Sequence, residues 1–224
     1  QTTVASAGNL TSAVYRIFGK PFSEEGKKLF GVPFAQFLKL NSEFRYHYRI
    51  DKNQMIASRI AGGVIWSYGN ATTAPYTEQF YIGGANSVRA FSARSIGPGG
   101  YPPETDRKYT YINHVGDIRI EANIEYRFRM IADLHGAVFL DAGNVWLMRK
   151  DENRPDGEFT LKNFPKQIAL GTGFGLRYDL DFLVFRLDLG IGLHDPYDTG
   201  KSGYYNIPKF KDSMALHFAI GYPF

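Results

Sequence analysis

The chain of 224 residues contains no cysteine, so disulfide bonds and thiolate metal sites are both excluded. It also lacks any run of about 18 consecutive apolar residues, which excludes a transmembrane helix. Its 26 basic and 22 acidic side chains are mixed along the sequence, without the basic block that indicates a nucleic-acid partner. These absences leave open a membrane protein that crosses the bilayer with strands, because alternating strands average to a polar-looking chain.

Aromatic residues are abundant, with 15 tyrosines and 18 phenylalanines. Both strands and membrane interfaces favour them. Residues 117–130 show the pattern that decides between these contexts, because polar and apolar side chains alternate without a break. Successive side chains of a strand point to opposite faces, so this strand has one charged face and one apolar face. Its length exceeds the usual 5–6 residues of a strand in a soluble protein and suits a tilted membrane-spanning strand of about 9–11 residues.

Comparable alternation predicts strands at 38–50, 56–68, 137–146, 170–180, 183–193 and 216–224, with residues 2–7 as the end of one more. Short connections are expected at 51–53, 131–134 and 179–182, and long ones at 8–34, 69–117, 147–167 and 194–213. Short and long connections alternate throughout, as in outer-membrane barrels, whereas a β-sandwich gives no reason for this. We therefore predict an all-β, transmembrane antiparallel β-barrel whose carboxyl terminus lies on the short-turn, periplasmic side.

Aromatic residues are expected to form a girdle at each end of the barrel. At the short-turn end these are Tyr46, Tyr48, Tyr126, Phe128, Tyr178, Tyr222 and Phe224. At the long-loop end these are Trp66, Tyr68 and Trp146. The alternative is that they are core residues of a soluble β protein.

Glycines lie on the inward faces of the expected strands, at Gly171, Gly173, Gly175, Gly190 and Gly192. Glycine within a strand often marks the close approach of another backbone. The best candidate is the stretch FYIGGANSVRAFSARSIGPGGYPP at 80–103, which we expect to enter the lumen from the extracellular side. Side chains already fill an eight-stranded barrel, so a larger barrel is predicted. Because the chain also begins almost inside a strand, we expect it to be a carboxy-terminal half.

Four segments carry a family resemblance: GGANSVRAF (83–91), EANIEYRF (121–128), GAVFLDAGNVW (136–146) and FAIGYPF (218–224). Together and in this order they resemble the BamA/TamA superfamily of outer-membrane barrel proteins, also described as bacterial surface antigen barrels, and the TamA-like branch in particular. The resemblance implies that residues 1–224 are about the last eight of sixteen strands. It also implies that periplasmic POTRA domains and the first strands are not present in this chain.

The resemblance also implies roles for individual residues. The loop motif would comprise Gly83, Gly84, Val88, Arg89, Ala90 and Phe91. Its arginine would meet an acidic inner wall made by Glu125 and Asp141. One side of a weak lateral seam would be formed by Leu216, Phe218, Ile220, Tyr222 and Phe224. Ala90 stands where the family has glycine, so the backbone would be strained if that position needs a positive φ.

The resemblance implies a non-enzymatic component of the bacterial outer membrane that helps to insert or assemble outer-membrane proteins or envelope material. Its partners would be outer-membrane lipid, unfolded substrates, the remaining barrel strands and a periplasmic TamB-like protein or assembly lipoproteins. Two alternatives remain: a two-partner-secretion transporter, and the anchor of an upstream enzyme such as a patatin-like lipase.

No cofactor, metal or catalytic residue is expected. The glycine pairs precede no helical pattern that would make a phosphate site. Glu121 and Glu125 would lie about 13 Å apart along one strand, too far to share a substrate bond. The five histidines are scattered without metal-ligand spacing.

Overall fold

The computed structural model describes residues 1–22, 25–102 and 114–224. Eight strands form one sheet in the order β1-β4-β5-β6-β7-β8-β9-β10, and every neighbouring pair is antiparallel. The strands are β1 (Thr2–Ala7), β4 (Phe37–Arg49), β5 (Gln54–Ser67), β6 (Ile118–Ile131), β7 (Leu134–Trp146), β8 (Ala169–Asp179), β9 (Val184–His194) and β10 (Met214–Ile220). The all-β antiparallel prediction is therefore confirmed.

The connections between the strands contain small helices and one short hairpin. They are α1 (Asn9–Ile17), the hairpin strands β2 (Lys28–Leu29) and β3 (Val32–Pro33), and the 3-10 helices η2 (Phe164–Gln167) and η3 (Phe210–Ser213). The sequence patterns did not predict α1 or the β2–β3 hairpin. No helix within the described ranges is long and apolar enough to cross a membrane.

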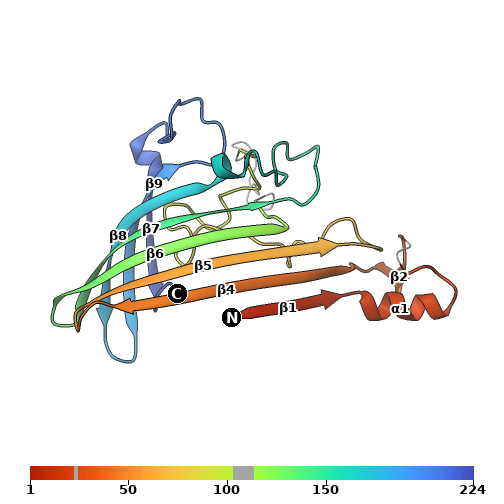
Figure 1. The fold of residues 1–224 in the computed structure, drawn as a ribbon, viewed down its shortest axis with the longest axis horizontal. Helices are drawn as coiled ribbons and strands as arrows, with labels where there is room; N and C mark the ends of the chain where they lie inside the picture. The colour runs from red at the N-terminus through yellow and green to blue at the C-terminus, as the bar shows by residue number, and fades with distance from the viewer. Residues whose placement is uncertain (23–24, 103–113) are drawn as a thin grey trace.

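The sheet is strongly curved, and all its tight turns lie at one end (Figure 1). The turns β4–β5, β6–β7 and β8–β9 gather at the lower left of that view, and the long connections lie towards the opposite end. The alternation of short and long connections is thus a property of the fold. One end of the curved sheet therefore carries the tight turns, and the other end carries the long connections.

The two faces of the sheet differ in the way that the alternating pattern predicts. On the convex face large apolar side chains are exposed, including Phe44 at 66% and Ile60 at 62%. On the concave face charged side chains are buried, and Glu125 and Arg177 are both fully covered. A water-soluble sheet would bury the apolar face, so this inverted arrangement is the one that a lipid environment stabilises.

The apolar core lies between the concave face and the long β5–β6 connection. Ile82 and Val88 from this connection pack with Ile65 of β5 and Val145 of β7. The connection therefore contributes its own buried side chains to the inside of the curved sheet. Pro103, the last residue of the predicted lumen-entering stretch, lies outside the described residues.

The last strand is shorter than its sequence pattern predicts. Strand β10 ends at Ile220, and Gly221 has a φ of 82°, which breaks the extended backbone. Phe224 is consequently 7% exposed, with its ring near the guanidinium groups of Arg59 and Arg127. Its predicted place in an outward aromatic girdle is wrong, because the chain turns inward before reaching it.

The predicted outward position of Trp146 is also wrong. Its indole is fully buried, and its Nε1–H donates a hydrogen bond of 2.9 Å to Oε1 of Gln167. Phe159 and Phe164 pack against the ring at centroid distances of 5.5 and 5.6 Å. The β7–β8 connection thus covers Trp146, whereas Trp66 is 60% exposed on the convex face.

Candidate functional site

The motif segment folds into a tight hairpin inside the sheet. Gly83 and Gly84 have φ values of 92° and 90°, and a side chain on Gly83 would lie 2.2 Å from the carbonyl oxygen of Ser92. The amide of Gly84 donates to the carbonyl of Phe91 at 2.8 Å, which closes the hairpin. Both glycines are therefore required by backbone geometry, and the hairpin carries Arg89 at its tip.

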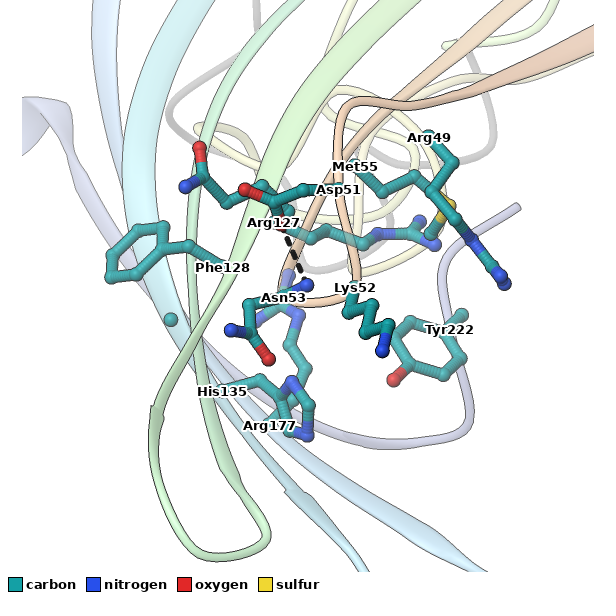
Figure 2. Close-up of a pocket in the computed structure, with 12 residues that line it drawn as sticks. Arg49, Asp51, Lys52, Asn53, Met55, Arg127, Phe128, His135, Arg177 and Tyr222 are labelled. Atoms are coloured by element: carbon teal, nitrogen blue, oxygen red, sulfur yellow. Dashed lines mark hydrogen bonds between the residues drawn. The ribbon is translucent and has the colours of Figure 1, made fainter.

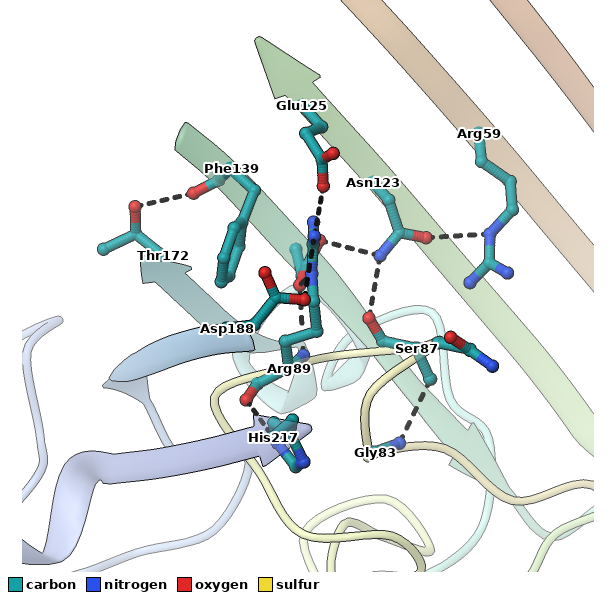
Figure 3. A network of polar contacts seen from close by, with 12 residues as sticks. Arg59, Gly83, Ser87, Arg89, Asn123, Glu125, Phe139, Thr172, Asp188 and His217 are labelled. Atoms are coloured by element: carbon teal, nitrogen blue, oxygen red, sulfur yellow. Dashed lines mark hydrogen bonds and ion pairs between the residues drawn. The ribbon is translucent and has the colours of Figure 1, made fainter. Parts of the chain in front are cut away.

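Arg89 is fully buried among three carboxylates, those of Glu125 and Asp141 and, at a longer 3.9 Å, that of Asp188 (Figure 3). Its Nε and Nη2 donate to the two oxygens of Asp141 at 2.8 and 2.9 Å, and its backbone amide donates to Asp141 at 3.0 Å. Its Nη1 donates to Glu125, and its guanidinium carbon lies 3.5 Å from the ring centroid of Phe139. The structure thus brings together the three residues that the resemblance selected.

The charge of Arg89 is maintained by this environment. Burial alone lowers the pKa of a guanidinium group, but hydrogen bonds to Asp141 and the charges of Asp141 and Glu125 outweigh it. The net effect raises the pKa of Arg89 above its ordinary value. Bidentate pairing with a carboxylate suits the planar guanidinium and would not be reproduced by lysine.

The two carboxylates differ in their other partners. Glu125 is also paired with Arg127 at 2.7 Å and with Arg177 at 3.1 Å. Within the described ranges, Asp141 has Arg89 as its one cationic partner, together with a 2.9 Å hydrogen bond from Asn123. The loss of Arg89 would therefore leave Asp141 more poorly compensated than Glu125.

Glycines on β8 and β9 make room for the hairpin. A side chain on Gly190 would lie 2.2 Å from the carbonyl oxygen of Arg89, and one on Gly171 would lie 2.2 Å from Cβ of Ala90. The expectation that an inward glycine marks a close backbone approach is met at Gly190, whereas at Gly171 the close atom is the side-chain methyl of Ala90. At Gly173 the space is taken instead by the carbonyl oxygen of Leu189 and the ring of Phe139.

Ala90 departs from the family motif without backbone strain. It is absent from the residues with positive φ and is 5% exposed, with its methyl group over Gly171. Its position at the tip of the hairpin thus tolerates a side chain, because the facing residue of β8 has none.

The residues predicted for the seam strand divide into two groups. Leu216, Phe218 and Ile220 are 62–68% exposed on the outward face of β10. Tyr222 is 40% exposed but follows the end of the strand, and Phe224 is buried. On the inward side of β10, Nε2 of His217 lies 2.9 Å from the carbonyl oxygen of Arg89. The sequence did not predict this contact, because every residue has a backbone carbonyl and no side-chain pattern indicates which one His217 would reach.

Two polar cavities lie beside the buried charges of Arg89 and its carboxylate partners. One of about 520 Å³ lies beside the hairpin, between Arg59, Glu121 and Ser87. The other, of about 150 Å³, lies near the tight turns and is lined by Arg49, Lys52 and other side chains (Figure 2). No group of acidic, histidine or cysteine side chains suited to a metal ion occurs within the described ranges.

An apolar convex face, a charged concave face and an inner loop held by ion pairs together define this sheet as part of a transmembrane antiparallel β-barrel of the outer-membrane type. Comparison with known proteins gives the family. The sequence model described as the Omp85 superfamily domain matches residues 28–224, so this chain belongs to the Omp85 superfamily.

Curated relatives and a solved structure agree with this family. "Outer membrane protein assembly factor BamA" from Nitratidesulfovibrio vulgaris is 28% identical over 204 residues, covering 89% of this chain and 22% of the relative. The protein of the same name from Neisseria meningitidis serogroup B is 29% identical over 89 residues, covering 38% of this chain and 11% of the relative. The crystal structure of Haemophilus ducreyi BamA lacking POTRA domains 1–3 has a TM-score of 0.56 at 17% identity, over 83% of this chain and 35% of that one. The chain thus spans about a fifth or less of the length of these curated relatives.

Proposed function

We propose that this chain is the carboxy-terminal part of an outer-membrane barrel that inserts or assembles other outer-membrane proteins or envelope material through a lateral seam. The proposed activity is not enzymatic and uses no cofactor. The carboxyl terminus would face the periplasm, where a TamB-like protein or assembly lipoproteins would bind the full-length protein. Assignment to the TamA-like branch remains a prediction from sequence.

The observation that carries this proposal is the length of β10. It has 7 residues, whereas β4 to β9 have 11–14. A strand that crosses the bilayer needs about 9–11 residues. β10 is fully paired with β9, and its other edge has no strand partner within the described ranges. Whichever strand closes the barrel therefore finds few backbone hydrogen bonds at β10, which favours a seam that opens.

An exposed edge of this kind can pair with a strand of another protein. Unpaired backbone N–H and C=O groups are a template for β-augmentation. The outward side chains Leu216, Phe218 and Ile220 are apolar, so an incoming strand would enter the lipid directly at this edge. The contact of His217 with Arg89 gives the inner loop a direct connection to the same strand.

A disulfide across the seam tests the proposal. We expect that a cysteine replacing Ala215 and a cysteine opposite it in the closing strand of the full-length protein will abolish insertion when oxidised. The measurement is the rate at which a denatured outer-membrane protein folds into proteoliposomes containing the variant. Reduction should restore the rate, because the disulfide does no more than hold the two strands together.

A matched control uses a disulfide where opening is not proposed. Ala122 of β6 and Ala142 of β7 lie directly opposite in the register, so cysteines at these positions lock an already paired interface. This variant should insert the substrate equally well when oxidised or reduced. Insertion that persists with the seam oxidised would overturn the proposal, and continued export of a dedicated secreted partner would then identify a secretion transporter.

A further inference from the structure

Helix α1 exposes its large apolar side chains, although they would be buried in a helix on the surface of a water-soluble protein. Leu10, Val14 and Ile17 follow each other at helical spacing along one face, with exposed fractions of 82%, 45% and 82%. Phe18, directly after the helix, is 79% exposed beside them. The buried residue of the helix is Ser12.

Hydrogen bonds attach the polar face of α1 to the end of the sheet that carries the long connections, which we call the rim. The hydroxyl of Ser12 donates to Gln36 at 2.9 Å and accepts from Nζ of Lys27 at 3.1 Å. The hydroxyl of Tyr68 donates to the side-chain oxygen of Asn9 at 2.7 Å. These bonds hold the helix in one rotation, so its apolar face is turned away from the polar rim.

The start of α1 lies at the level where the apolar convex face ends. In the register, Ser6 of β1 is opposite Leu38 of β4, and Leu38 is opposite Trp66 of β5. Exposed tryptophan is typical of the boundary between membrane and water. Gly8, with a φ of 71°, turns the chain from β1 directly into the helix. Helix α1 therefore begins at the edge of the lipid-facing surface.

The neighbouring β2–β3 hairpin adds to the same surface. Phe30 at its turn is 97% exposed, and Val32 is 65% exposed. The hydroxyl of Tyr15 donates to the carbonyl of Lys28, which joins the hairpin to the helix. Exposed cations, Arg16, Lys20 and Lys28, accompany these apolar groups. We call the set Leu10, Val14, Ile17, Phe18, Phe30 and Val32 the rim patch.

We infer that the rim patch lies in the interfacial layer of the lipid bilayer, with anionic headgroups next to Arg16, Lys20 and Lys28. This inference rests on the membrane placement of the barrel and not on an insertase activity. An amphipathic helix of this kind lies in the plane of the interface, with its apolar face about 5–10 Å into the boundary between headgroups and acyl chains. Cations on its flanks add attraction to anionic lipid.

Fluorescent labels on single cysteines test the inference. The full-length protein, freed of any other cysteine, receives Ile17→Cys or, as a control, Glu152→Cys, and each cysteine carries an environment-sensitive dye. Both positions are exposed, and position 152 lies outside the rim patch, in the charged β7–β8 connection. The proteins are reconstituted into phosphatidylethanolamine–phosphatidylglycerol vesicles, with or without doxyl groups high on the acyl chains. We expect the label at position 17 to lose most of its fluorescence to the doxyl lipid and to resist aqueous iodide.

The label at position 152 should show the reverse preference, which controls for a general effect of the dye. If position 17 is quenched by iodide as strongly as position 152, the patch lies in water and the inference fails. If neither quencher reaches position 17, the patch is covered by the remaining strands or loops of the protein, which also overturns it. A barrel that fails the seam test can still pass this one, so the two proposals are separable.

Discussion

Replacing Arg89 with alanine is expected to destabilise the folded barrel by about 3–5 kcal/mol, because it leaves a buried carboxylate without its cation. Arg89 and Asp141 are both fully buried, and no solvent is available to compensate for the lost hydrogen bonds. The readout is the temperature at which the full-length protein loses its compact, heat-modifiable mobility in detergent gels. Equal melting of the variant and the unmodified protein would refute a stabilising role for the pair.

Arg94→Ala is the matched control in the same segment. Arg94 is half-buried, contacts the rings of Tyr76 and Tyr81 and donates a hydrogen bond to the hydroxyl of Tyr76; within the described ranges it forms no ion pair with a carboxylate. Cation–π contacts at partly exposed sites contribute about 0.5–1 kcal/mol, so its loss should lower the melting temperature far less. A similar loss for both arginines would show that any large side chain in this loop has the same effect.

A double-mutant cycle separates the two carboxylates. In the Arg89→Ala background, Asp141→Asn should recover part of the lost stability, because it removes the charge that has no other cation. Glu125→Gln should recover none, since Glu125 keeps its pairs with Arg127 and Arg177. Residues in one network show non-additive effects, so strictly additive losses for Arg89 and Asp141 would contradict the pairing.

Most of the sheet was predictable because its alternation is long and regular. In β6 polar and apolar residues alternate over the whole strand, and the predicted range 117–130 differs from the observed one by a single residue at each end. The end of β10 was not predictable in this way. The alternating apolar side chains continue through Tyr222 and Phe224, although Gly221 has already turned the backbone inward.

The candidate site was predictable only where a side-chain pattern or a family motif marks it. Parity placed Glu125 and Asp141 on the inner face, and the family motif added Arg89. The contact between His217 and the carbonyl of Arg89 needed coordinates, because it joins a strand to the backbone of a distant loop. Helix α1 was missed for a related reason: it is short, lies in a long connection and buries its polar face.

A methyl group added at Gly190 is expected to displace the motif hairpin from the inner wall. The new carbon would lie 2.2 Å from the carbonyl oxygen of Arg89, 2.6 Å from its carbonyl carbon and 2.7 Å from Cα of Ala90. All three are backbone atoms, so no flexible side chain can move aside. Overpacking at such a site costs about 1–3 kcal/mol, and displacement of the hairpin would also weaken the pair between Arg89 and Asp141.

Gly192→Ala supplies the control from the same face of the same strand. There the added carbon would find its nearest neighbours at 3.4–3.6 Å, which is ordinary van der Waals contact. We expect Gly190→Ala to lower the melting temperature clearly and to expose a cysteine placed at the buried position of Val88 to maleimide. Gly192→Ala should do neither, because the hairpin backbone does not occupy its space. If both alanine variants lower the melting temperature equally, Gly190 is needed for strand flexibility and not for the approach of the loop. If neither lowers it, the loop does not occupy the space at Gly190. Either result would contradict the docking of Arg89 described above.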